Sequence, residues 1–251
     1  MTAVRLLVIS TALLFLPLLV SAQDRSERPP LITDRPDFTE SGISVPRGSV
    51  QIEGGLTWER FKGELDTVSG PETLVRYGIG ERLELRVGLP NLIANGDASG
   101  AGDSSLGAKL EFGSRDDAWD LAGILTVSIP TGDKEYSSDG IDPSMIIAAG
   151  IDLSESWSFG TQISAGYPSE RDQRAFEWGG TLVLGRSLTD RSGAFFEIAA
   201  VVPETGTAAI SFHTGFVVLL STDVQFDVHG GTGLSDTAPD VFIGAGLAAR
   251  F

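Results

Sequence analysis

Charged side chains recur on alternate positions in several stretches of this chain. Carboxylates and guanidinium groups on neighbouring strands can line a water-filled path and set its ion preference, or can cross-link an interior shut. Across the turn at residues 80–81 we place Arg76 opposite Glu84, with Glu72 and Arg86 diagonal to them. Both chemistries remain open for the full set of charged residues, which is Glu53, Glu59, Glu72, Arg76, Glu84, Arg86, Lys109, Glu111, Glu197 and Asp227.

The only two histidines, His213 and His229, lie on the same predicted inner face as Glu197. Two imidazoles and one carboxylate could bind Zn²⁺, and the same group is the only candidate for hydrolytic catalysis. Ser211 shares a face with His213 but lies two residues away on the same strand, so it is not placed as a nucleophile. We therefore expect hydrogen bonds between the histidines, with no metal, no cofactor and no catalytic residue.

Strands must position these side chains, and the last one shows the pattern most clearly. Residues 241–251 place Val241, Ile243, Leu247 and Phe251 on one face, with glycine, alanine and arginine dominating the other. About ten residues of period two are enough for a tilted strand to cross a bilayer. The alternation begins at residue 49 and repeats to the end of the chain.

Counting these segments predicts about twelve strands of an antiparallel, up-and-down transmembrane β-barrel, an all-β fold. Tight turns near residues 80, 154, 190 and 222 fall on one side, and longer polar loops starting near 61, 91, 130, 168 and 235 on the other. Short periplasmic turns and long outer loops are typical of outer-membrane barrels. The connections at 114–120 and 203–206 fit either side, so ten and fourteen strands are the alternatives.

Composition agrees with this fold. The chain has 31 glycines and no cysteine among 251 residues, and after residue 22 it has no apolar run long enough for a membrane helix. The net charge of −16 argues against nucleic acid as a partner, because a phosphate backbone selects clustered lysine and arginine. Acidic loops facing water explain this charge, although such loops could also bind divalent cations that bridge lipopolysaccharide.

The N-terminus predicts export. Arg5 precedes an apolar run that ends in small residues, so we interpret residues 1–22 as a signal peptide rather than an uncleaved anchor. Residues 23–48 carry four prolines and no sustained alternation, and form a periplasmic tail. This tail is either a linker or a partial plug in the barrel mouth, with Asp34, Arg35 and Asp37 as its charged residues. Residues 49–251 form the barrel.

A soluble β-sandwich would also alternate, and it is the main competing fold. It would place large apolar residues inside and polar ones in water. Here the polar face carries many charges and the apolar face carries aromatic residues near strand ends, as in membrane girdles. The pattern therefore favours a membrane barrel with a hydrated lumen.

Three stretches resemble a known family. They are 33–41 (TDRPDFTES), 48–55 (GSVQIEGG) and 72–86 (ETLVRYGIGERLELR), with weaker matches at 102–109 and 129–132. This pattern is similar to the transporter family labelled "MetA-pathway of phenol degradation". The resemblance implies an outer-membrane barrel related to channels for hydrophobic and aromatic compounds. The terminal Phe251 also resembles the assembly signal of such barrels.

We therefore expect an outer-membrane channel of a Gram-negative bacterium that passively admits small molecules, including hydrophobic or aromatic ones, and is not an enzyme. The alternatives are a structural barrel without a conducting path and a hydrolase working in the lumen. Expected partners are outer-membrane lipids and lipopolysaccharide, the barrel assembly machinery and a small solute.

Overall fold

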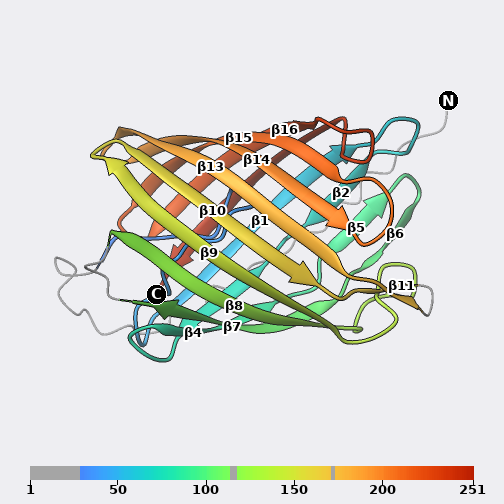
Figure 1. Cartoon of the computed structure of the whole chain (residues 1–251), viewed down its shortest axis with the longest axis horizontal. Helices are drawn as coiled ribbons and strands as arrows, with labels where there is room; N and C mark the ends of the chain where they lie inside the picture. Colours follow the sequence, from blue (N-terminus) through green and yellow to red (C-terminus); the bar gives the residue numbers. More distant parts are fainter. Residues whose placement is uncertain (1–28, 114–117, 171–172) are drawn as a thin grey trace.

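The computed structural model describes residues 29–113, 118–170 and 173–251. The predicted signal peptide, residues 23–28 and parts of two predicted connections lie outside the described residues. Within those ranges, twelve antiparallel strands close into one barrel, as the alternation predicts (Figure 1). They are β1 (Val50–Arg60), β3 (Leu74–Gly78), β4 (Leu83–Gly88), β7 (Ser104–Phe112), β8 (Trp119–Ile129), β9 (Asp142–Ser154), β10 (Trp157–Gly166), β13 (Glu177–Thr189), β14 (Ser192–Pro203), β15 (Ala209–Ser221), β16 (Val224–Gly233) and β17 (Val241–Arg250).

The barrel closes between its first and last strands. β1 pairs with β17 from Gln51↔Arg250 to Arg60↔Val241. At the chain end, the Phe251 amide donates to the Val50 carbonyl at 2.8 Å. Because closure removes both sheet edges, the strand backbones can satisfy one another inside lipid. Among the described residues, none forms a helix long and apolar enough to cross a bilayer.

Two predicted loops contain short strands instead. β2 (Thr67–Gly70), β5 (Leu92–Asn95) and β6 (Ala98–Ala101) continue the sheet beside β1 in the order β1-β2-β5-β6. The prediction that residues 61–70 and 91–103 are loops is therefore wrong over these stretches. Their glycine, serine and asparagine residues indicate turns when read locally, but the pairing of these strands with one another and with β1 holds them in a sheet. A further small ribbon joins β11 (Ser169–Glu170) to β12 (Gln173–Arg174).

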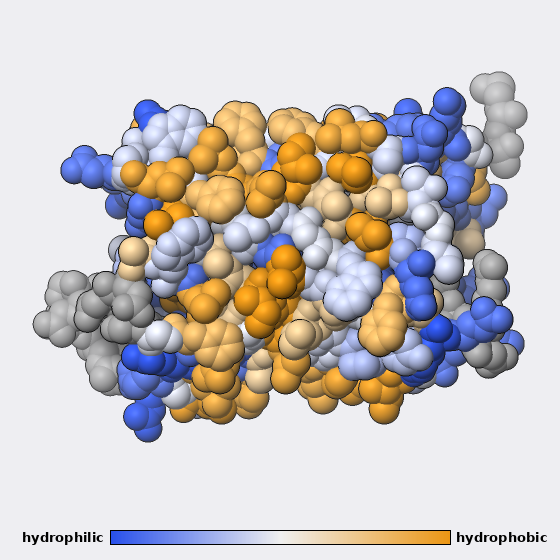
Figure 2. Space-filling view, viewed as in Figure 1, coloured by the Kyte–Doolittle hydropathy of each residue, from blue (hydrophilic) through white to orange (hydrophobic). Residues whose placement is uncertain are grey.

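The two faces of the barrel wall have opposite polarity. Outward side chains such as Leu85, Leu125 and Ile163 are 45%, 63% and 67% exposed, whereas Glu84 and Glu197 on the inner face are almost fully buried. Figure 2 shows apolar residues over the middle of the visible face and hydrophilic residues toward its two ends. This belt is suited to hydrocarbon, so the fold and its surface place the protein in the outer membrane.

The two ends of the barrel also differ. The connections after β3, β9, β13 and β15 are short, whereas those at 130–141 and 234–240 are long. By the usual asymmetry, the short-turn end faces the periplasm. One long loop is held by Asp103, whose carboxylate accepts hydrogen bonds from Thr131, Gly132, Ser137 and Ser138 at 2.7–3.0 Å.

The described part of the tail, residues 29–48, reverses direction inside the periplasmic half of the lumen. Its start lies near the short turns, where Arg250 donates to the carbonyls of Pro29 and Pro30 at 2.8 and 3.1 Å. Its end returns there, because the Gly48 amide donates to the Gly78 carbonyl at 2.7 Å. Between these points the tail contacts wall strands on every side of the lumen.

Candidate functional site

Arg76 on β3 is the centre of the inward charges and is fully buried. Its Nε lies 2.9 Å from Glu84 Oε1, and its Nη1 lies 2.8 Å from Glu53 Oε1. Arg86 on β4 also reaches Glu84, at 3.1 Å. The wall therefore carries a connected network of guanidinium and carboxylate groups, which only the lumen-facing positions of period-two strands could bring together.

The register of this network differs from the one predicted. Arg76 pairs with Arg86, and Glu84 pairs with Gly78, so placing Arg76 opposite Glu84 was wrong by two residues. The amides of Ile79 and Gly80 both donate to Leu83, which centres the turn one residue later than expected. A shift of two keeps every side chain on its face, and the long arginine side chain spans the diagonal to Glu84.

The tail places the carboxylate of Asp34 among three cations of the wall. Its oxygens lie 3.0 Å from Arg76 Nη1, 2.6 Å from Arg86 Nη1 and 2.8 Å from Lys109 Nζ. Burial raises the pKa of Asp34, but the charges of Arg76, Lys109 and Arg86 outweigh it and hold the pKa well below its ordinary value. Removing one partner from such a buried network costs about 3–5 kcal/mol.

Glu40 is a second tail carboxylate on the same wall. Both of its oxygens accept from Arg86 Nη2 at 2.9 Å, and Lys109 Nζ lies 3.6 Å away. The whole cluster combines four carboxylates (Asp34, Glu40, Glu53, Glu84) with three cations (Arg76, Arg86, Lys109). It is balanced when one carboxyl group is protonated. Consistently, burial and the charge of Asp34 raise the pKa of Glu40 to about 7.

Arg35, the next residue of the tail, points to a different set of acids. Its Nη1 donates to Glu72 Oε2 at 2.7 Å, and its Nη2 donates to Asp227 Oδ1 at 3.3 Å. Asp227 on β16 is fully buried, and the side chain of Arg35 is only 13% exposed. Successive tail residues of opposite charge are thus bound by groups of opposite charge on the wall.

Two glycines of the wall make room for this guanidinium. A side chain added at Gly55 on β1 or Gly246 on β17 would collide with Arg35. Glu72 lies in the break between β2 and β3 with φ 46°. This left-handed conformation costs a non-glycine residue about 1–2 kcal/mol, and the Glu72 amide is held by Asn91 Oδ1 at 2.7 Å. The wall is therefore shaped around the Arg35 side chain.

Glu197 on β14 anchors the tail on the opposite side of the lumen. Its carboxylate accepts from the Phe38 amide at 2.9 Å and from Thr39 Oγ1 at 2.6 Å. Thr39 Oγ1 also lies 2.5 Å from Thr181 Oγ1 on β13. Burial and the charge of Glu197 raise the pKa of the neighbouring Asp37 well above its ordinary value, which favours the neutral acid in the docked tail.

The two histidines continue from Glu197, as the sequence predicts. His213 Nδ1 lies 2.8 Å from Glu197 Oε2, and His213 Nε2 lies 3.0 Å from His229 Nδ1. Each ring nitrogen of His213 thus lies within hydrogen-bonding distance of one partner, Glu197 at Nδ1 and His229 at Nε2. Both nitrogens of His213 are therefore engaged by protein groups. No cluster with the makings of a metal site occurs in the described ranges.

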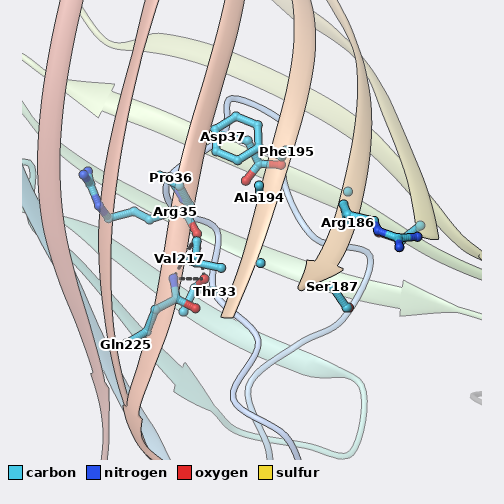
Figure 3. A pocket seen from close by; sticks show the side chains of 13 residues that line it. Thr33, Arg35, Pro36, Asp37, Arg186, Ser187, Ala194, Phe195, Val217 and Gln225 are labelled. Atoms are coloured by element: carbon cyan, nitrogen blue, oxygen red, sulfur yellow. Dashed lines mark hydrogen bonds between the residues drawn. The ribbon is translucent and has the colours of Figure 1, made fainter. Parts of the chain in front are cut away.

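A cavity of about 260 Å³ lies between the tail and the wall formed by β10 and β13 to β16 (Figure 3). Thr33, Arg35 and Asp37 line it from the tail, and Phe195 and Gln225 from the wall. Gln225 Nε2 donates to Thr33 Oγ1 at 3.0 Å, one of the hydrogen bonds drawn in Figure 3. The tail thus fills the lumen unevenly and leaves space on this side.

The other predicted interior residues are distributed along the lumen. Glu111 accepts from the amide and hydroxyl of Ser44, the hydroxyl at 2.8 Å, so it also holds the tail. Glu59 lies nearer the long loops, where it pairs with Phe242 on β17 and is partly exposed. Of the predicted set, therefore, Glu59 lies apart from the residues that contact the tail, and His229 is linked to the tail through His213.

Several residues that hold the tail were not singled out from the sequence. They are Glu40, Thr39, Thr181, Gln51, Gln162 and Gln225, together with Gly55 and Gly246. Glu40 lies in the charged, proline-containing stretch that also contains Asp34, so charge density there was a usable signal. Uncharged lumen residues such as Gln162, which contacts Phe38 and Glu40, carry no such signal because glutamine and threonine are common on any inner face.

Comparison with known proteins gives a family and a fold. The family described as "Putative MetA-pathway of phenol degradation" matches residues 33–251. No curated protein matches the sequence. Among solved structures, the COG4313 outer membrane channel from Pseudomonas putida F1 superposes with a TM-score of 0.65 at 15% identity, covering 83% of this chain and 97% of that one.

Two porins superpose less closely. NanC porin has a TM-score of 0.59 at 8% identity, covering 80% of this chain and 100% of its own. KdgM porin has a TM-score of 0.55 at 7% identity, covering 81% and 99%. At these identities the similarity establishes the outer-membrane barrel fold.

Proposed function

Because the chain belongs to the family of the MetA-pathway of phenol degradation, we propose that this outer-membrane barrel is a channel that passively admits small molecules. Residues 29–48 act as a plug that closes the path from the periplasmic side. A solute passes when the plug moves, through a lumen lined by the charged side chains of the wall.

One observation carries this proposal: a separate segment, residues 29–48, lies in the lumen and is bound to the wall through ion pairs and hydrogen bonds. Asp34, Arg35 and Glu40 bind the wall almost entirely through charged groups. Water and solute ions can replace such contacts, whereas the contacts of a packed apolar core have no replacement. A segment held in this way can leave without unfolding the barrel.

A disulfide can test whether the plug moves. The described chain has no cysteine, and the hydroxyls of Thr39 and Thr181 lie 2.5 Å apart, so Thr39→Cys/Thr181→Cys introduces one tether between plug and wall. In planar bilayers and in liposome swelling, the oxidised variant is expected to lose conductance and solute flux. Reduction should restore both to the level of the unmodified protein.

Each single cysteine variant is the matched control, because it alters the side chain without forming the tether. A fully oxidised variant that conducts like the reduced one would contradict plug movement. Absence of conductance and flux in the unmodified protein would instead favour the structural barrel without a path.

For the solute class, aromatic compounds are the first candidates, because the family is described by phenol degradation. The charged lumen favours aromatic solutes that carry a polar or charged group over purely apolar ones. Uptake of labelled phenol and of labelled benzoate, by cells with and without the protein, compares a neutral with a charged aromatic solute. This assay also detects a route that leaves the barrel sideways into lipid, which bilayer currents would miss.

The hydrolase alternative has a specific weakness. His213 and His229 hydrogen-bond to each other and to Glu197, and in the described residues neither imidazole has a serine or threonine hydroxyl as partner. Nucleophilic catalysis requires that contact. Retained flux in a His229→Gln variant would agree with a channel in which these side chains support the plug.

We also propose that Phe251 serves in assembly. Its side chain is 40% exposed at the end of the closing seam, while its backbone pairs with Val50. Deleting Phe251 is expected to lower the amount of folded protein in the outer membrane severalfold, with little change in conductance per channel. The heat-modifiable band on gels measures the first quantity, and normal levels of the deletant would count against an assembly role.

The remaining proposed partners follow from the same placement. The apolar belt contacts outer-membrane lipid, and the acidic outer loops face lipopolysaccharide, where divalent cations would bridge acidic side chains and phosphates. Folding of the purified barrel in vesicles with and without lipopolysaccharide and Mg²⁺ tests the second contact through a change in folding yield.

A further inference from the structure

The plug presents two adjacent residues of opposite charge to two differently charged surfaces of the lumen. Asp34 faces the cations of β3, β4 and β7, and Arg35 faces Glu72 and Asp227. Both surfaces belong to the barrel and not to the plug. Their charges therefore remain in place, and need new partners, whenever the plug leaves.

The surface that binds Arg35 has both the space and the carboxylates that a cation needs. Gly55 and Gly246 leave a space that a Cβ would fill, and Glu72 holds a left-handed conformation beside it. The match to Arg35 is nevertheless incomplete. Within the described structure, Arg35 Nε and Asp227 Oδ2 are buried without a hydrogen-bond partner. A free cation with more freedom than a tethered arginine could pair the carboxylate fully.

The cluster that binds Asp34 has three wall cations, Arg76, Arg86 and Lys109, but two wall carboxylates, Glu53 and Glu84, so it needs one more anion when the plug leaves. Lys109 is fully buried, and its ammonium group contacts Asp34 at 2.8 Å and Ser41 at 3.1 Å, both in the plug. Arg86 likewise binds Asp34 and Glu40. A buried cation that loses its carboxylate is strongly destabilised, so an open lumen favours any solute that supplies a carboxylate here.

From these two surfaces we infer that the lumen contains a binding site for small zwitterionic solutes, which the Asp34–Arg35 pair of the plug occupies in the closed state. The inference rests on the proposed function, since it deepens the channel by naming a solute class. The solute carboxylate takes the place of Asp34 beside Arg86 and Lys109. Its ammonium or guanidinium group takes the place of Arg35 between Glu72 and Asp227.

The two surfaces together explain why a zwitterion fits better than a simple ion. A carboxylate alone would compensate Lys109 and leave Glu72 and Asp227 exposed to each other. A cation alone would compensate Glu72 and Asp227 and leave Lys109 without its carboxylate. Because Asp34 and Arg35 are adjacent in the chain, the first solute to test is one small molecule that carries both a carboxylate and a guanidinium group, as free arginine does.

Direct binding is the first test and does not require a conducting channel. The variant Asp34→Asn/Arg35→Gln removes both charges of this pair, while Glu40 remains beside Arg86 and Lys109. L-Arginine should raise its Tm more than an equimolar mixture of acetate and guanidinium does, because one molecule compensates both surfaces. In the unmodified protein, where the plug occupies the site, the shift should be smaller.

Current block is the second test. In bilayers containing Asp34→Asn/Arg35→Gln, arginine should reduce the ion current at roughly tenfold lower concentration than acetate or guanidinium. Adding Glu72→Gln/Asp227→Asn should remove this advantage. The matched control is Glu59→Gln, an inward acid nearer the loops, which should leave it unchanged.

The outcomes separate the two proposals. Equal effects of arginine and of the acetate and guanidinium mixture, in both measurements, would overturn the zwitterion site while leaving the channel in place. Arginine binding without any current in any variant would support the site and overturn the channel. If the double variant does not fold, saturable uptake of labelled arginine by the unmodified protein in liposomes, against a neutral solute of equal size, decides the same question.

Discussion

On the side of β1, β3, β4 and β7 the plug meets charged side chains, whereas on the side of β8 and β9 the wall presents small and apolar ones. The inward residues there include Ala122 and Ala148, both fully buried, and Ile124 at 2% exposed. The plug backbone comes close on this side: a Cβ at Gly42 would lie 2.7 Å from the backbone of Asp120.

The two sides of the wall therefore have different roles in binding the plug. Ion pairs fix where the plug binds, because each charge requires a partner of opposite sign at a set distance. The small side chains of β8 and β9 provide close contact without directional bonds. Since ions and water can replace the first kind of contact, opening should depend on the charged side.

The largest expected effect comes from Asp34→Asn. This change removes the plug carboxylate that contacts Arg76, Arg86 and Lys109 together, and should weaken plug binding by about 3–5 kcal/mol, a hundredfold or more. Conductance should rise strongly, and the plug should become sensitive to added protease. Asp97→Asn, an exposed loop acid, is the control. If Asp34→Asn left both conductance and protease resistance unchanged, the charged side would not hold the plug.

A smaller effect is expected from a single methyl group on each side. Gly246→Ala should displace the Arg35 guanidinium, at a cost of about 1–3 kcal/mol for overpacking, and raise conductance severalfold. Gly150→Ala on β9 is the matched change, because its Cβ would meet only the Phe159 carbonyl, at 3.9 Å. Equal conductance of the two variants would remove the distinction between the two sides.

The charged side should also respond to pH. Glu40 has a pKa raised to about 7 by burial and by the nearby Asp34, so protonation favours the docked plug. The neutral Glu40 carboxyl group stabilises the docked plug. This stabilisation is fully present below the ordinary glutamate pKa of 4.5 and is lost as pH rises through about 7. Asp37, also raised, acts in the same direction, whereas Asp34 opposes it only in stronger acid.

Conductance should therefore fall as pH is lowered from about 7.5 to about 5. Glu40→Gln, which stays neutral throughout, should flatten this profile while Arg86 and Lys109 keep their other partners. The measurement is macroscopic conductance at several pH values. A profile that rises toward acid, or that is unchanged in Glu40→Gln, would show that this carboxyl group does not control the plug.

The sequence predicted the barrel wall well because strand alternation is a local property. Period two assigns Glu53, Lys109 and Asp227 to the inner face whatever their partners are. Register is less local: the turn after β3 is centred one residue later than expected, so Arg76 lies opposite Arg86 and not opposite Glu84. Such a shift changes no face, so nothing in the hydrophobic pattern opposes it.

The plug contacts could not be predicted in the same way. Residues 29–48 have no period, so no rule connects Asp34 to Lys109, which lies 75 positions later. Those pairs follow from tertiary charge matching once the barrel is closed. Similarly, Gly246 resembles any glycine of a strand until Arg35 is placed against it.

The smallest effect is expected on the apolar side. Ile124→Val removes one buried methylene and should lower the stability of the folded barrel by about 0.5–1.5 kcal/mol. It alters no charge and no hydrogen bond, so conductance and its pH profile should match those of the unmodified protein. Urea unfolding in detergent and bilayer recording measure the two quantities. Because a closed plug needs close contact as well as charge, a conductance change larger than that of Gly246→Ala would transfer control of the plug to β8 and β9.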